Sequence, residues 1–127
     1  MMIKIFLLGD SIRMNYDSYV KEKLKNKAEV FSPNDNGMFT QFTLRMLHDW
    51  YRAVLKGSIP NIVHFNNGLW DVLRLSNENN TFNSIEEYLN NLYRITERII
   101  YLSPNAKIIF ATTTPVIEPG FTPGIML

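Results

Sequence analysis

Apolar runs alternate with segments of helical periodicity along the whole chain. Four short apolar runs, each bounded by glycine or polar residues, are typical of buried strands. They cover residues 3–8, 28–31, 62–65 and 107–111. Between them, apolar positions recur every three to four residues, as on the buried side of an amphipathic helix. This order of elements predicts right-handed crossovers and a parallel sheet with helices on both faces, an α/β fold of three layers, α/β/α.

Local signals mark where the helices begin and end. Ser84, with Glu87 three residues later, has the pattern of a capping box and predicts the start of the last helix. The long middle helix is expected over residues 39–55, where a Lys-Gly-Ser-Ile-Pro sequence stops it. The polar, asparagine-rich stretch 76–83 is expected to form a surface loop.

Composition narrows the function classes. The 127 residues predict one domain, 1–127, and 46% of them are hydrophobic, enough for a buried core. The net charge of +1, without a basic patch, argues against nucleic acid or an acidic membrane as a partner. The absence of cysteine excludes disulfides, thiolate catalysis and cysteine metal sites. No stretch has the length of a signal peptide core or a membrane span, so a cytoplasmic location is the default expectation.

Polar clusters follow all four predicted strands. They are Asp10-Ser11, Asn34–Gly37, Asn66–Gly68 with Asp71, and Thr112–Pro115. Carboxyl ends of parallel strands lie at one edge of a sheet, and ligands bind there in open α/β folds. We therefore expect the four clusters to meet in one site. The simpler interpretation of Asp10 and Ser11 is that they cap the following helix.

Three of these segments resemble the SGNH (GDSL-type) hydrolases, a family of serine esterases with a flavodoxin-like sheet. Gly9-Asp10-Ser11-Ile12 is similar to the family's first block, and Gly37 to its second. Asn67-Gly68-Leu69-Trp70-Asp71 falls where the third block, Gly-x-Asn-Asp, belongs. The segments occur in order, each after the expected strand, and the resemblance runs from Ile3 to about Pro115. The longer phrases around them are similar to one bacterial branch of the family.

The resemblance implies hydrolysis of an O-acyl ester, on a small molecule or a carbohydrate, with no cofactor. Such a reaction needs an oxygen nucleophile, a base that takes its proton, and donors aimed at the developing oxyanion. Ser11 is the implied nucleophile, and its place at a helix N-terminus offers its own N–H as a donor. The resemblance assigns a second donor to the N–H of Gly37, and Asp10 supports the turn.

The third block departs from the family pattern. The asparagine that supplies a side-chain amide to the oxyanion hole aligns here with Trp70. Asn66, Asn67 and the Trp70 indole remain as alternatives, of which Asn66 is favoured; both asparagines are also ordinary turn residues. Asp71 is expected to orient loops by accepting backbone hydrogen bonds rather than to transfer protons.

The family's last block, Asp-x-x-His, supplies the general base, and nothing similar occurs in residues 116–127. A fifth strand and a final helix likewise have no counterpart. Neither histidine is expected to replace this base: His48 falls within the second helix, far in sequence from any strand end, and His64 is expected to be a core residue. Arg13 is expected to be an exposed residue of the first helical turn. The alternative to an esterase is therefore a truncated, non-catalytic binding module. In either case the fourth strand would be an exposed edge, through which we expect self-association.

Two other kinds of functional site have less support in the sequence. A nucleotide-binding or receiver-like flavodoxin fold would need a glycine-rich phosphate loop or an acidic pair after the first strand, and the sequence has neither. A metal site is not expected, because the two histidines and the carboxylates lack ligand spacing.

Overall fold

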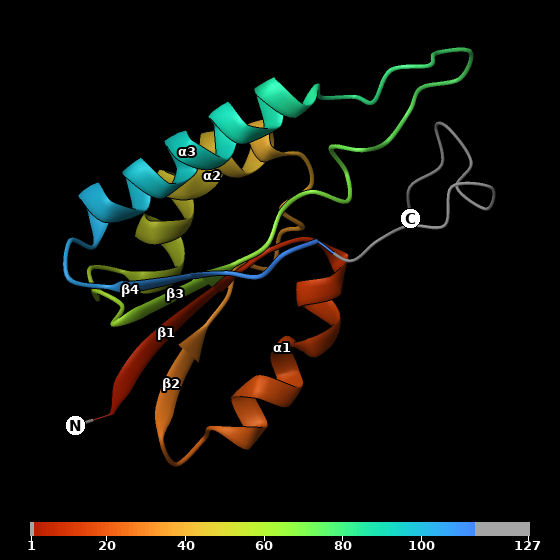
Figure 1. The fold of residues 1–127 in the computed structure, drawn as a ribbon. Coiled ribbons are helices and arrows are strands. Elements are labelled where there is room, and N and C mark those ends of the chain that lie inside the picture. Colours follow the sequence, from red (N-terminus) through yellow and green to blue (C-terminus); the bar gives the residue numbers. More distant parts are fainter. Residues whose placement is uncertain (1, 114–127) are drawn as a thin grey trace.

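The computed structural model describes residues 2–113 and contains one parallel sheet of four strands (Figure 1). The strand order is β2-β1-β3-β4. Thr114, Pro115 and the segment searched for an Asp-x-x-His block lie outside the described residues. The strands are β1 (Ile3–Leu8), β2 (Ala28–Phe31), β3 (Ile62–Phe65) and β4 (Lys107–Phe110).

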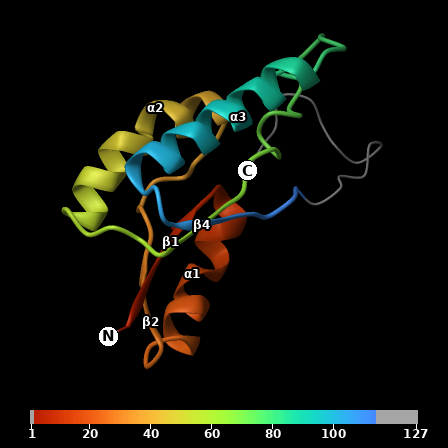
Figure 2. The same ribbon diagram turned by 60° about the vertical axis from the view of Figure 1, so that its left-hand side comes forward.

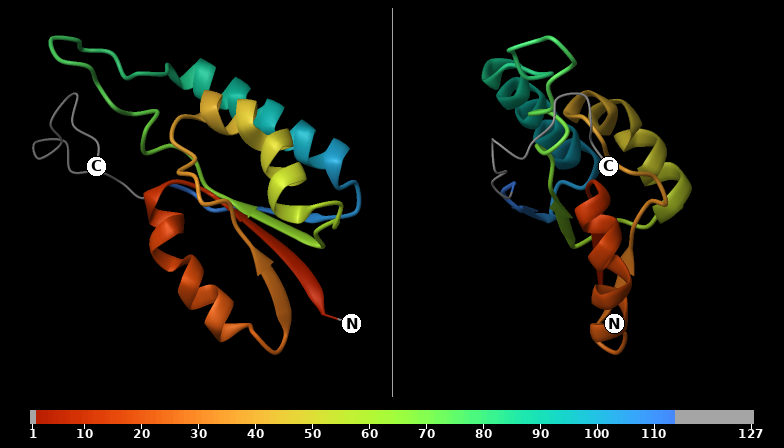
Figure 3. Two further views of the ribbon diagram at one scale, coloured as in Figure 1. Left: turned by 180° about the vertical axis from the view of Figure 1, so that it is seen from behind. Right: turned by 90° about the vertical axis from the view of Figure 1, so that its right-hand side faces the viewer.

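The helices lie on both faces of the sheet, which confirms the predicted α/β/α layers. One face is covered by α1, and the opposite face by α2 and α3 packed side by side (Figures 1 and 2). The two further views of Figure 3 show the same separation of α1 from the other helices. The helices are α1 (Ser11–Lys23), α2 (Thr40–Trp50) with a π-helical continuation η1 (Tyr51–Leu55), and α3 (Ile85–Leu102).

The main core lies between the sheet and the α2–α3 pair. Successive strand residues point to opposite faces, so Phe6 and Leu8 of β1 enter this core while Leu7 faces α1. Phe6 is fully buried, and its ring meets that of Tyr51 edge to face at 5.1 Å. The Tyr51 hydroxyl is satisfied by Ser103 Oγ at 2.7 Å. The other buried hydrophobic residues of this core are Leu47, Trp50, Leu55, Val63, Phe65, Ile95 and Ile99.

Both predicted helix caps are present. Asp10 is the N-cap of α1 and accepts a hydrogen bond from Ile12 N at 3.0 Å. Ser84 and Glu87 form a complete capping box at the start of α3, with bonds of 3.1 and 2.8 Å. The middle helix, expected as one α-helix, instead ends in the π-helical turn η1, after which Lys56 adopts a left-handed conformation with φ of 50°.

Residues 2–113 cover the α1 face of the sheet only in part. An open apolar groove runs beside α1 over β3 and β4, and Ile109 at its border is 39% exposed. Among the strands of residues 2–113, β4 lies at the edge of the sheet, as predicted. Within residues 2–113, no helix has the length and apolar character needed to span a bilayer. The groove is lined by Ile5, Leu7, Tyr16, Val20, Leu24, Ile62, His64, Ile109 and Ala111.

Candidate functional site

Ser11 is the first residue of α1 and directly follows the turn that leaves β1. It is partly exposed, and within residues 2–113 its N–H has no hydrogen-bond partner. The first amides of a helix are unpaired in this way and carry the positive end of the helix dipole. Gly9 makes the turn possible, because it has φ of 156° and a Cβ there would overlap Asn66 Oδ1. The local geometry thus presents a hydroxyl and a free amide together.

Gly37 lies against this turn, as expected, but its amide is already occupied. Its N–H donates to the carbonyl oxygen of Gly9 at 2.8 Å, so it is not a free donor for an oxyanion in this conformation. A Cβ at Gly37 would lie 2.8 Å from Gly9 O and 3.1 Å from Thr43 Oγ1. Gly37 therefore permits two loops to approach closely, whereas its predicted role as an oxyanion donor would require its bond to Gly9 O to break.

Arg13 is not the exposed first-turn residue that was predicted. Its side chain is only 1% exposed and binds the carbonyl oxygens of three residues on two loops. Its guanidinium donates to Pro33 O at 2.8 Å, Asp35 O at 2.5 Å and Gly9 O at 3.3 Å, and it forms a 3.0 Å ion pair with Asp17. Burial lowers the pKa of Arg13, and the Asp17 carboxylate opposes that shift. Arg13 joins the β2–α2 loop to the turn before Ser11.

Of the three side chains considered as the additional oxyanion donor, Asn66 is the one that lies at the turn before Ser11. Its Nδ2 donates to Asp10 Oδ1 at 3.3 Å, and its Oδ1 is buried without a partner among residues 2–113. The Asn67 side chain instead points into the interior and donates to Thr43 Oγ1 at 2.9 Å. The Trp70 ring packs edge to face on Phe39, with ring centroids 5.1 Å apart.

Asp10 links the turn to Asn66. Its carboxyl is 1% exposed, and Oδ1 accepts hydrogen bonds from both Ile12 N and Asn66 Nδ2. Oδ2 is buried and has no partner within the described part of the chain. Asp10 thus caps α1, and it also holds the Asn66 side chain against the turn.

Asp71 binds the start of α2 rather than Ser11. It accepts hydrogen bonds from Thr40 Oγ1 at 2.6 Å, from Thr40 N at 3.3 Å and from Asn83 Nδ2. Burial raises the pKa of the Asp71 carboxyl, and the bonds from Thr40 and Asn83 oppose this shift. The backbone bond agrees with the expected loop-orienting role. The residue that sequence reasoning missed is Thr40, whose N–H and hydroxyl both donate to Asp71 at the start of α2.

Neither histidine is bonded to Ser11. His64 faces the α1 side, with its ring centroid 6.4 Å from that of Tyr16, and burial lowers the pKa of its imidazole. His48 lies on α2 and stacks on Tyr101 at 6.5 Å. Among residues 2–113, Ser11 Oγ has no hydrogen-bond partner, and no group of three histidine or carboxylate side chains is arranged to hold a metal ion.

The fold and this site together define a class: a parallel α/β protein with a serine at the carboxyl edge of its sheet, beside an asparagine and a helical amide that no residue of the described chain pairs. The sequence matches no protein-family model and no curated protein. A functional assignment therefore rests on the geometry of the site.

Proposed function

We propose that this chain carries the nucleophile and the oxyanion donors of a serine ester hydrolase of the SGNH (GDSL) type. The substrate is an O-acyl ester of a small molecule or a carbohydrate. The observation that carries the proposal is the position of Ser11, whose hydroxyl and unpaired N–H both stand at the N-terminus of α1. Asn66 lies against the preceding turn and is the closest candidate for a second donor.

The proposed chemistry begins with attack of Ser11 Oγ on the ester carbonyl carbon. A general base takes the hydroxyl proton, and the carbonyl π electrons move to the oxygen, which the Ser11 N–H and the Asn66 amide stabilise. Collapse of this intermediate re-forms the carbonyl and expels the alcohol, which receives the proton. Water then releases the acid from the acyl-serine. The base is the part that no described residue supplies, since none bonds to Ser11 Oγ.

Hydrolysis of 4-nitrophenyl acetate tests this proposal. We expect the wild-type chain to release 4-nitrophenolate faster than Ser11→Ala, because an acyl-serine forms only in the former. Ser18→Ala is the matched control: Ser18 is an exposed serine on the same helix, and its removal should leave the rate unchanged. Equal rates for the wild type and Ser11→Ala, with both chains folded by circular dichroism, would contradict the proposal.

The second candidate is a non-catalytic binding module on the same scaffold. Two observations favour it: Ser11 Oγ has no base bonded to it within residues 2–113, and the Gly37 amide is already used by Gly9. An unassisted serine hydroxyl is a poor nucleophile near neutral pH. The comparison of wild type with Ser11→Ala separates the two candidates, because a binding module gives no Ser11-dependent rate.

A further inference from the structure

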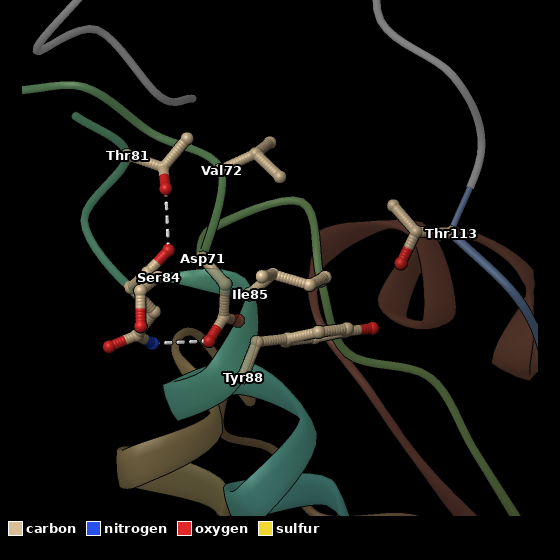
Figure 4. A pocket seen from close by; sticks show the side chains of 9 residues that line it. Asp71, Val72, Thr81, Ser84, Ile85, Tyr88 and Thr113 are labelled. Carbon is tan, nitrogen blue, oxygen red and sulfur yellow. Dashed lines mark hydrogen bonds between the residues drawn. The ribbon is translucent and has the colours of Figure 1, made fainter. Parts of the chain in front are cut away.

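A cavity of about 250 Å³ lies at the carboxyl edge of the sheet, between the loop after β3 and the first turn of α3 (Figure 4). Val72, Ile85 and Tyr88 form its walls on one side, and Thr113, just beyond β4, stands on the other. Gly68 is part of the lining. The cavity therefore begins two residues beyond the asparagine that contacts the Ser11 turn.

The polar groups around the cavity are bonded to other parts of the protein. Asp71 and Asn83 are hydrogen-bonded to each other. The Tyr88 hydroxyl and Thr113 Oγ1 both donate to the carbonyl oxygen of Asn67, at 2.6 and 2.9 Å. These side chains are thus already satisfied, and what they leave facing the cavity is mainly hydrocarbon.

The apolar walls are accessible to a ligand. Of the apolar residues that line the cavity, Val72 is 38% and Ile85 68% exposed. Gly68 allows the loop to close against Thr113, because a Cβ at Gly68 would overlap Thr113 Oγ1 and lie 2.9 Å from the Tyr88 hydroxyl. The structure thus holds a small, preformed apolar recess at the same edge of the sheet as Ser11.

We propose that this cavity binds a short, uncharged apolar arm of the substrate. Because an apolar cavity of about 150 Å³ holds benzene, 250 Å³ holds a chain of roughly six to eight carbon atoms. A charged group would lose its hydration there without gaining a partner. The statement that this arm is part of an ester depends on the function proposed above. The binding of an apolar group in the cavity does not depend on that function.

Binding of the n-alkanols from ethanol to decanol, followed by the methyl NMR resonances of Val72 and Ile85, tests the proposal without any catalytic step. We expect the affinity to rise roughly three- to fourfold for each added methylene group and to level off at about six to eight carbons. The Ser11→Ala chain should bind equally well. Unperturbed Val72 and Ile85 methyl groups, or an affinity that rises without a break up to decanol, would overturn the proposal.

A variant that fills the cavity gives a second test. Val72→Phe keeps the site apolar but occupies its volume, so hexanol affinity measured at Ile85 should fall at least tenfold. Leu89→Phe is the control, because Leu89 is an exposed α3 residue outside this lining. Equal affinities for the two variants would contradict the proposal. If the chain binds alkanols but shows no Ser11-dependent ester hydrolysis, the cavity proposal stands and the esterase proposal is refuted. If it hydrolyses the ester through Ser11 but binds no alkanol, the esterase proposal stands and the cavity proposal is refuted.

Discussion

The amide of Gly37 donates a hydrogen bond to the carbonyl oxygen of Gly9 at 2.8 Å. This bond joins the loop between β2 and α2 to the turn that precedes Ser11. The Arg13 guanidinium donates to the same Gly9 oxygen at 3.3 Å, so one carbonyl receives both interactions. The position of the proposed nucleophile therefore depends on contacts between segments more than twenty residues apart in the sequence.

Substitution of Gly37 tests that contact. In Gly37→Ala the new Cβ would lie 2.8 Å from a backbone oxygen, which can move only if a loop shifts. We expect a loss of about 1–3 kcal/mol in the free energy of unfolding, measured with urea. Gly57→Ala is a useful comparison, because beyond its two chain neighbours no atom lies within 4 Å of the new Cβ, and its cost comes from φ of 91°. Unchanged stability of Gly37→Ala would show that the two loops are not in close contact.

Arg13→Met should destabilise the fold by about 2–4 kcal/mol, because the buried carbonyl oxygens of Pro33 and Asp35 lose a charged donor. Methionine keeps most of the length of the side chain, so the loss reports on the guanidinium. Arg45→Met is the control: Arg45 is 72% exposed, and its ion pair with Asp49 should contribute less than about 0.5 kcal/mol. Equal unfolding midpoints for the two variants would contradict the buried position of Arg13.

Asp71 makes a distinct contribution to the pH dependence of stability. Because burial raises its pKa in the folded state, the folded chain holds this proton at pH values where the unfolded chain has released it. The Asp71 contribution is therefore most favourable below the pKa of the unfolded state and is lost as the pH rises through the folded-state pKa. We expect Asp71→Asn to remove this pH-dependent contribution. The difference in the free energy of unfolding between the wild type and the variant should therefore change between pH 4 and pH 7. Parallel curves would refute a raised pKa.

The groove over β3 and β4 predicts self-association of the chain, with a second copy covering the apolar edge. Edge strands with unpaired backbone groups and apolar neighbours are frequent sites of such contacts. We expect multi-angle light scattering to show a mass that rises with concentration, and Ile109→Lys to restore a monomer. Ile100→Lys is the control, since Ile100 is equally apolar and 50% exposed but lies on α3. A monomeric wild type at high concentration would contradict this prediction.

Sequence patterns predicted the elements well where the signal is local. The apolar runs located all four strands, and the Ser84–Glu87 spacing located the start of α3, because strand burial and helix capping depend on neighbouring residues. Asp10 was likewise interpretable as a cap from its position alone.

The site was predictable only in part, because its contacts are long-range. The loop carbonyls bound by Arg13 are about twenty residues away, a distance at which no periodicity applies, so its charge suggested exposure. Asn66 and Asn67 are identical in type, yet adjacent residues leaving a strand point in different directions, and only Asn66 meets Asp10. The hydrogen bond that occupies the Gly37 amide also depends on the packing of two loops.

The most direct test of the central claim is the site at which a fluorophosphonate probe labels the purified chain. We expect mass spectrometry to find the adduct on Ser11, to find none in Ser11→Ala, and to show a rate that increases with pH as the hydroxyl becomes easier to deprotonate. Ser18→Ala and Ser84→Ala should be labelled like the wild type. An adduct spread over several exposed serines, or a folded chain that stays unlabelled up to pH 10, would contradict the assignment of Ser11 as a nucleophile.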